Sequence, residues 1–203
     1  MHQFRAVTET VADPLAALRQ REAELRHQAL HDDLTGLANR SLLWDRMEHA
    51  IALGERQSNP LALVAIDVRS LRVVNDTMGH QAGDQLLISM GERIRSGVRP
   101  ADTVARIGGD EFAVLMELVE LGGPEALADR LLTSLSASFL VRECKLVVGV
   151  SIGIALNLWG EVTPDDLLRV AENALRESKA LGRGPVVARH VHARPPLRLI
   201  TPA

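Results

Sequence analysis

A stretch in the middle of the chain, RIGGDEFAVLM (106–116), places two glycines and two acids directly before an apolar run. The apolar run is short and partly β-branched, which is typical of a buried strand. In the segment before the glycines, 103–107, the side chains of Val104 and Arg106 alternate with those of Ala105 and Ile107, which predicts a second strand. Gly108 and Gly109 favour a hairpin between them, because both residues can adopt φ > 0. The sequence therefore predicts a β-hairpin that brings Asp110 and Glu111 to the start of a core strand.

Composition narrows the class of protein. The chain has 203 residues and a net charge of −3, so it lacks the overall positive charge that attracts nucleic acids. It has no Tyr, which also argues against a surface on which bases stack. A single Cys144 fits a reducing compartment. The longest apolar runs, such as 61–66, are too short to span a membrane, and the N-terminus lacks an apolar signal core. We expect a soluble cytoplasmic protein with no nucleic-acid and no membrane partner.

Periodicity and turn residues predict one mixed α/β domain, with the order βααββαβα from Leu61 onward. Gly54 and Gly182 are expected to close the helices that precede them. A Pro-rich segment, 189–203, is expected to be a loose tail. The expected helices are 14–31, 40–53, 70–78, 81–95, 124–137 and 164–181, and the expected strands are 61–67, 103–107, 112–116 and 145–155.

The first helix carries a narrow apolar stripe formed by Leu15, Leu18, Leu25 and Ala29. Glu22 interrupts this stripe, which weakens it as a coiled-coil seam. Two interpretations therefore stand side by side: a helix that packs on its own domain, and a stalk that pairs two chains.

Asp67 ends the strand LALVAID (61–67), at the edge where α/β sheets tend to bind ligands. If this strand lies beside the hairpin, Asp67 comes close to Asp110 and Glu111. Converging carboxylates repel one another unless a cation lies between them, and oxygen ligands suit Mg²⁺ or Mn²⁺. The alternative is that Asp67 simply caps the next helix.

Five ordered motifs resemble the diguanylate cyclase family, whose GGDEF domain is named after the residues found here at 108–112. The other four are HDDLTGLANR (31–40), IDVRSLRVVNDTMGHQAGDQLL (66–87), VSIGIA (150–155) and AENALRESKALGR (171–183). The resemblance implies a single GGDEF domain over 31–188, with a central, mostly antiparallel sheet surrounded by helices as in nucleotidyl cyclases. It also implies an N-terminal segment and signalling helix over 1–30, and the loose tail over 189–203.

The resemblance implies an enzyme that condenses two GTP into cyclic di-GMP and two pyrophosphates. Each domain holds one GTP, so catalysis needs a homodimer. Two Mg²⁺ or Mn²⁺ ions per site are assigned to Asp67, the Val68 carbonyl, Asp110 and Glu111. Asp110 is the candidate for assisting deprotonation of the attacking hydroxyl, and the metals neutralise charge on the phosphates.

Substrate-binding roles follow from the same resemblance. Asn75 and Asp84 match the pair that reads guanine, and Gly108 and Gly109 leave room for the phosphates. His80 either touches substrate or is an ordinary turn histidine. The positions that match triphosphate-facing cations are Arg72, Lys179 and Arg183, of which the last two also suit a helix C-terminus.

The resemblance also implies a product-inhibition site of the form R-x-x-D just upstream of the hairpin. Arg99 and Asp102 match it at the family distance, with Arg130 as a helper on the following helix. Guanidinium groups suit the phosphates and guanine edges of a cyclic dinucleotide.

Departures from the family pattern occur around the site. Arg69 replaces an acid, Leu71 a Phe, Arg176 a Tyr and Gly184 an Asn, none of which removes a metal ligand. Arg69 adds positive charge near the metal entrance, which either weakens cation binding or replaces a phosphate contact.

The main alternative function is a module that binds GTP or cyclic di-GMP and regulates a partner without catalysis. The third candidate function is that of an unrelated phosphohydrolase. A sensor domain or partner upstream would supply the input signal.

Overall fold

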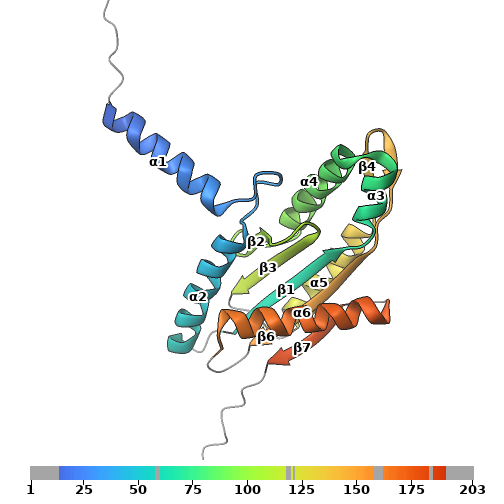
Figure 1. Ribbon diagram of the computed structural model, residues 1–203. Helices are drawn as coiled ribbons and strands as arrows, with labels where there is room; N and C mark the ends of the chain where they lie inside the picture. The colour runs from blue at the N-terminus through green and yellow to red at the C-terminus, as the bar shows by residue number, and fades with distance from the viewer. Residues whose placement is uncertain are drawn as a thin grey trace, which may run out of the picture.

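The computed structural model describes residues 14–57, 60–117, 120, 122–157, 162–182 and 185–190 (Figure 1). Arg183 and residues 191–203 lie outside them. The helices are α1 (Pro14–Leu30), α2 (Arg40–Gln57), α3 (Leu71–Met78), α4 (His80–Ser96), α5 (Gly123–Leu135) and α6 (Pro164–Leu181). The strands are β1 (Leu61–Val68), β2 (Thr103–Arg106), β3 (Glu111–Glu117), β4 (Phe139–Val141), β5 (Cys144–Leu146), β6 (Val150–Asn157) and β7 (Val186–His190).

The described strands form a five-stranded sheet in the order β2-β3-β1-β6-β7, with β4 and β5 paired separately. β1 is antiparallel to both β3 and β6, and only the β6–β7 pair is parallel within this sheet. The predicted single α/β domain with a mostly antiparallel sheet is confirmed. Every residue of β1 is buried, because helices cover both faces of the sheet at its centre.

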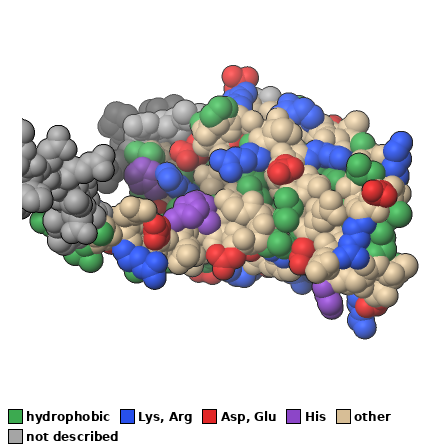
Figure 2. Space-filling view, turned by 90° about the horizontal axis from the view of Figure 1, so that it is seen from above, with side chains coloured by type: hydrophobic (Ala, Val, Ile, Leu, Met, Phe, Trp, Pro, Cys, Tyr) green, Lys and Arg blue, Asp and Glu red, His purple; other side chains and the backbone are tan. Residues whose placement is uncertain are grey.

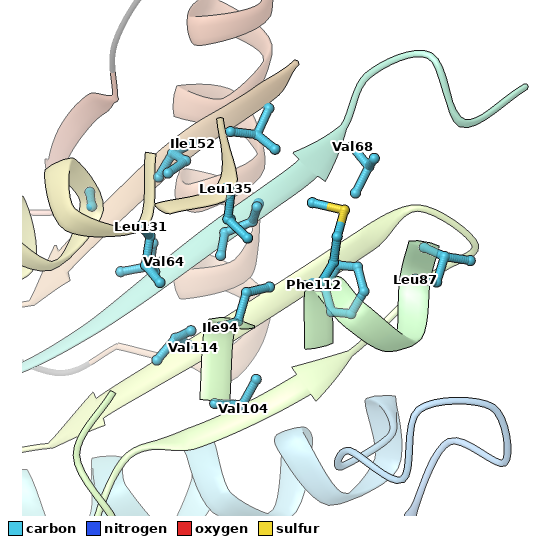
Figure 3. Packing of buried hydrophobic residues seen from close by; sticks show 14 of the residues in the cluster. Val64, Val68, Leu87, Ile94, Val104, Phe112, Val114, Leu131, Leu135 and Ile152 are labelled. Carbon is cyan, nitrogen blue, oxygen red and sulfur yellow. The ribbon is translucent and has the colours of Figure 1, made fainter. Parts of the chain in front are cut away.

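Alternate residues of the strands face two separate cores, as the two-residue period of a strand requires. On one face Val64, Phe112 and Ile152 pack against residues of α4 and α5, such as Ile94 and Leu131 (Figure 3). On the other face, residues such as Leu63, Ala113 and Ala155 pack against α2 and α6. The result is three layers, with the sheet held between two pairs of helices.

Local signals explain α6 well. Thr163 is the N-cap and its side chain accepts from the amide of Asp166, Pro164 opens the first turn, and Gly182 ends the helix with φ 68°. The prediction for Gly54 is wrong, since α2 continues through it to Gln57. A helix tolerates an interior glycine at a cost of about 1 kcal/mol, which packing of α2 on the sheet offsets.

The predicted strand over 145–155 is also wrong in one respect. Its first part belongs to a short hairpin, β4–β5, whose tight turn lies at Arg142–Glu143, and β6 begins only at Val150. Neither turn residue is Gly, Asn or Asp, so the usual hairpin signal is missing. At the C-terminal end, β7 continues through Arg189 and His190, which pair with β6.

Helix α1 projects from the body of the domain (Figure 1). Leu15, Leu18 and Leu25 are 59%, 66% and 52% exposed, so their stripe is not covered by the described part of this chain. Glu22, which interrupts the stripe, forms an ion pair with Arg26. The described part of the chain therefore gives no support to the interpretation that α1 packs its apolar stripe on its own domain.

Acidic and basic side chains are interspersed over the face shown in Figure 2, without a broad field of either sign. Across the described residues, none of the helices combines the length and the apolar character needed to cross a membrane.

Candidate functional site

The acids of the hairpin lie beside Asp67, as the sequence predicts. Asp67 is directly opposite Glu111 in the β1–β3 pair, and the amide of Val68 donates to the carbonyl of Asp110 at 3.0 Å. On its other side Asp67 is opposite Ser151 of β6. Pairing of the central strand with β3 therefore brings the carboxylates to one end of the sheet.

Lys179 reaches this end of the sheet from the last turn of α6. Its Nζ donates to Oδ2 of Asp67 at 2.6 Å, and the Asp67 side chain is almost fully buried. A buried carboxylate needs such a cation. The alternative role for Asp67 as a helix cap is wrong, because the N-cap position of α3 is Ser70, which makes no side-chain cap bond.

The glycines of the turn act differently from the prediction. Neither Gly108 nor Gly109 has a positive φ. The Glu111 side chain instead lies close to Gly108, since a Cβ there would be 2.9 Å from Oε2 of Glu111 and would make that carboxylate shift. Gly109 has open space around its Cα, and its carbonyl accepts from Nη2 of Arg106 at 2.8 Å. The turn thus lets the Glu111 carboxylate fold back over the backbone.

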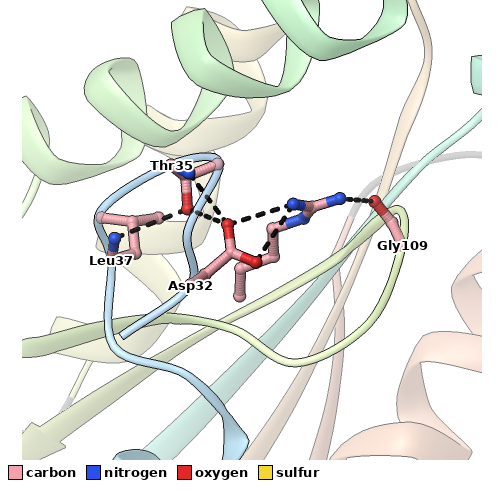
Figure 4. Close-up of polar contacts among 5 residues, drawn as sticks. Asp32, Thr35, Leu37 and Gly109 are labelled. Atoms are coloured by element: carbon pink, nitrogen blue, oxygen red, sulfur yellow. Dashed lines mark hydrogen bonds and ion pairs between the residues drawn. The ribbon is translucent and has the colours of Figure 1, made fainter. Parts of the chain in front are cut away.

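Arg106 connects this turn to the segment that follows α1, since it bonds both Gly109 and Asp32, which are labelled in Figure 4. Its Nη1 donates to both carboxylate oxygens of Asp32, at 3.0 and 3.2 Å. Oδ1 of Asp32 also accepts from the amide and the hydroxyl of Thr35, at 2.9 and 2.7 Å. Asp32, Thr35 and Arg106 therefore hold the Gly109 carbonyl, one residue before Asp110.

The environment of Asp32 affects its acidity. Burial by itself raises the pKa of the Asp32 carboxyl, but the bonds from Thr35 and the charge and bonds of Arg106 outweigh it, so the pKa lies below 3.8. The sequence marked this segment as a turn but did not show that its carboxylate reaches a residue 74 positions away. The spacing of Asp32 and Thr35, which suits a local side-chain turn, was the only available signal.

Arg69 lies at the entrance to α3 and is directed toward β6 and α6. Its Nε donates to Oγ of Ser151 at 2.7 Å, and its Nη2 is 3.4 Å from the carbonyl oxygen of Ser178. These contacts hold the guanidinium beside the α6 turn that carries Lys179. Arg69 is thus part of the wall of the site, on the side opposite β3.

The candidate guanine-reading residues lie on the helix pair α3–α4. Oδ1 of Asn75 is buried and has no hydrogen-bond partner among the described residues. It lies 1.9 Å from where a Cβ on Gly83 would be, so Asn75 keeps this position only while residue 83 is glycine. Asp84 and His80 are exposed on α4, and Gly79 joins the two helices with φ 84°.

The candidate phosphate-binding cations are dispersed. Arg72 is 93% exposed and lies 3.7 Å from the carboxylate of Asp76, while Lys179 contacts Asp67. Arg183 lies outside the described residues. The structure therefore brings Lys179 into contact with Asp67, while Arg72 contacts only Asp76 among the acidic side chains described.

The R-x-x-D residues form a compact turn beside a hollow of about 450 Å³. The amide of Arg99 donates to Oδ2 of Asp102 at 2.9 Å, and the amide of Asp102 donates to the Arg99 carbonyl. His31 and Arg95 also line the hollow. Arg130 is engaged elsewhere, because its Nε and Nη2 donate to the carbonyl of Gly97.

The donor set at the sheet end fits a hard divalent cation, since it consists of carboxylate and carbonyl oxygens. The Asp67 carboxylate is already paired with one positive charge, that of Lys179. Within the described residues, three or more His, Cys, Asp or Glu side chains do not converge into a ready-made cage.

A family model described as diguanylate cyclase, GGDEF domain, matches residues 29–185. Among curated proteins, the chain is 39% identical over 181 residues to the bifunctional diguanylate cyclase/cyclic di-GMP phosphodiesterase MucR of Pseudomonas aeruginosa. This match covers 89% of this chain and 26% of MucR. Diguanylate cyclase TpbB of the same species is 36% identical, over 89% of this chain and 42% of TpbB. The chain thus spans less than half the length of these relatives.

Solved structures of GGDEF domains are also similar to this chain. The GGDEF domain of TpbB from P. aeruginosa has a TM-score of 0.74 and 35% identity, covering 78% of this chain and 94% of that one. The coiled coil and GGDEF domain of DgcB from Caulobacter crescentus, in complex with c-di-GMP, has a TM-score of 0.80 and 28% identity. That match covers 87% of this chain and 93% of that one.

Proposed function

Because the chain belongs to the family of diguanylate cyclase GGDEF domains, we propose that it condenses two GTP into cyclic di-GMP and two pyrophosphates. The observation that carries this proposal is the direct opposition of Asp67 and Glu111 on neighbouring strands. Two carboxylates at one sheet end, with Lys179 beside them, suit a site for a metal-bound triphosphate.

Asp67, the Val68 carbonyl, Asp110 and Glu111 are the residues that hold Mg²⁺ or Mn²⁺, two ions per site in this proposal. When bound, such ions neutralise phosphate charge and lower the pKa of an attacking hydroxyl. Asp110 accepts the proton of the GTP 3′-hydroxyl. Gly109, which has open space around its Cα, leaves the backbone of the turn accessible to phosphate oxygens, and Gly108 joins it when the Glu111 carboxylate moves aside.

Base recognition is assigned to Asn75 and Asp84. Asp84 accepts from the N1–H and exocyclic amine of guanine, and Asn75 supplies the complementary bonds. The buried Oδ1 of Asn75 supports this role, since a buried acceptor without a partner is costly until a ligand donor reaches it. His80, exposed between the two, contacts the nucleotide from the helix turn. Adenine leaves these polar groups unpaired and is rejected.

Triphosphate binding is assigned to Lys179, Arg72 and Arg183. Lys179 supports the proposal by its position, because its ammonium group already lies beside Asp67. The exposed Arg72 has the rotational freedom to reach a phosphate on binding.

Catalysis in this proposal requires a homodimer, because one domain supplies one GTP and half of the reacting pair. The exposed stripe of Leu15, Leu18 and Leu25 supports pairing through α1. Burying each Leu contributes at most about 1.5–3 kcal/mol, and association entropy offsets much of this. We therefore expect a weak dimer that GTP or cyclic di-GMP strengthens by bridging domains.

Product inhibition is assigned to Arg99 and Asp102. The adjoining hollow, lined also by His31 and Arg95, supports this by offering cationic side chains to the phosphates of a cyclic dinucleotide. Arg130 joins them only if it releases the Gly97 carbonyl.

The second candidate function is a regulatory module that binds GTP or cyclic di-GMP without turnover. It is favoured by Arg69, whose guanidinium adds a second cation to the wall beside Lys179 and Asp67. Intact Asp67, Asp110 and Glu111 argue for the enzyme.

The experiment that tests the proposal is incubation of the purified protein with GTP and Mg²⁺, followed by chromatographic identification of the product. The parent should form cyclic di-GMP. Glu111→Gln, which removes a metal-binding charge and little volume, should form none while keeping its circular dichroism spectrum and melting temperature. Turnover by Glu111→Gln at the parent rate refutes the metal assignment, and GTP binding without product supports the regulatory module.

A further inference from the structure

The β4–β5 hairpin turns at two residues in an uncommon conformation. Arg142 and Glu143 have φ values of 46° and 65°, in the left-handed region that side chains other than Gly, Asn and Asp rarely adopt. Val141 and Cys144 close the hairpin on either side. Residues persist in such a conformation when surrounding contacts hold them there. At this turn, Arg142 makes contacts of this kind through its hydrogen bonds to α3 and α4.

Arg142 extends from the hairpin tip to the junction of α3 and α4. Its Nη1 donates to the carbonyl of Met78 at 3.3 Å, and its Nη2 donates to Oε1 of Gln81. Its backbone amide donates to Oε1 of Gln85 at 3.1 Å. One residue therefore binds the last residue of α3 and two successive turns of α4.

These contact points lie close in sequence to the candidate base-reading residues on α3 and α4. Gln81 and Gln85 flank Asp84 on α4, three positions before it and one after it, and Met78 is followed by the connecting Gly79. Asn75 lies one turn before Met78 on α3 and fits against α4 only through Gly83. A small shift of α3 against α4 therefore changes the distance between Asn75 and Asp84.

We propose that Arg142 is a positioning residue for nucleotide selection, which fixes α3 against α4 so that Asn75 and Asp84 read guanine together. This inference rests on the proposed function, and its substrate class is a guanine nucleotide. Arg142 does not touch the nucleotide. Its planar fork makes two directed bonds at once, which a lysine cannot reproduce.

The test compares Arg142→Ala and Arg142→Lys with the matched control Lys145→Ala. Lys145 is exposed on β5 of the same hairpin, three residues from Arg142. Arg142 is itself exposed and contacts Met78 only at the backbone carbonyl, so the variants should fold with melting temperatures close to that of the parent.

Binding of non-reactive GTP and ATP analogues is measured by calorimetry. Arg142→Ala should weaken GTP-analogue binding about tenfold and leave ATP-analogue binding unchanged, as expected when one directed hydrogen bond to the base is misplaced. Arg142→Lys should lie between parent and Ala, and Lys145→Ala should match the parent. An equal effect on both analogues, or none, overturns the inference.

Amide hydrogen exchange without nucleotide provides a readout independent of activity. Arg142→Ala should accelerate exchange over residues 76–85, while Lys145→Ala should not. Unchanged exchange in Arg142→Ala overturns the positioning role. A parent protein that fails to select the GTP analogue over ATP instead refutes the proposed function, so the two failures are distinguishable.

Discussion

Replacing Arg106 with methionine tests how the segment after α1 supports the catalytic turn. The change removes the two bonds to Asp32 and the bond to the Gly109 carbonyl, while keeping most of the apolar stem. The side chains of Arg106 and Asp32 are 12% and 24% exposed, so solvent replaces these bonds poorly.

The expected destabilisation follows from the chemistry of the bonds that the substitution removes. Removing one partner of a fully buried ion pair costs about 3–5 kcal/mol, and a hydrogen bond to a charged group contributes about 1.5–3 kcal/mol. Since Asp32 is partly exposed and keeps its bonds from Thr35, we expect Arg106→Met to lower the unfolding free energy by about 2–3 kcal/mol. Asp32→Asn should cost less, because Arg106 still holds Gly109.

Urea denaturation, with cyclic di-GMP synthesis measured in parallel, is the assay. The control is Arg169→Ala, which removes an exposed ion pair with Asp166 and should change the unfolding free energy by at most about 0.5 kcal/mol. Activity should fall more in Arg106→Met than in Asp32→Asn, because only the former frees the carbonyl next to Asp110. A stability loss in Arg106→Met no larger than in the control refutes the reasoning.

The same pair predicts a pH dependence. The pKa of Asp32 is lowered in the folded state from 3.8, so the charged pair stabilises the protein above that value. This contribution is lost as the pH falls below 3.8 through the folded-state pKa. The difference in stability between the parent and Asp32→Asn should shrink over this acidic range, and a difference that stays constant contradicts the pairing.

Three further substitutions test other parts of the site. Gly83→Ala should displace Asn75 and weaken GTP binding at least about tenfold. The control is Gly123→Ala, whose added Cβ has no neighbour within 4 Å and should leave GTP affinity unchanged. Equal GTP affinities of the two variants, measured by calorimetry, contradict this prediction. Arg99→Ala should relieve product inhibition without lowering the initial rate, and unchanged cyclic di-GMP binding refutes that assignment. Arg69→Ala should lower the unfolding free energy by about 1–2 kcal/mol and leave the Mg²⁺ requirement unchanged; a reduced requirement shows instead that Arg69 competes with the cation.

The central layer of the fold was predictable because its signals are local. The apolar run of β1 up to Asp67 and the short apolar run of β3 mark buried strands, and the acids at their adjoining ends come together once the strands pair. Thr163, Pro164 and Gly182 mark the ends of α6 by capping chemistry.

The parts that escaped prediction depend on contacts between distant segments. The β4–β5 turn uses Arg142 and Glu143, which carry no turn signal, and is held by side chains of α4. Likewise, the bond between Asp32 and Arg106 joins residues that no periodicity relates. The turn at Gly108 and Gly109 forms without a positive φ, so the conformational reason for expecting glycines there was wrong.

The measurement that tests the central claim most directly is specific activity across a dilution series, with sedimentation velocity at each concentration. If each domain supplies one GTP to a shared reaction, the rate of cyclic di-GMP formation per chain should fall as the dimer dissociates. Leu18→Glu on the exposed stripe should move this fall to higher protein concentration, while Gln20→Glu on the same helix should not. Specific activity that stays flat while the sedimenting species is a monomer contradicts the account.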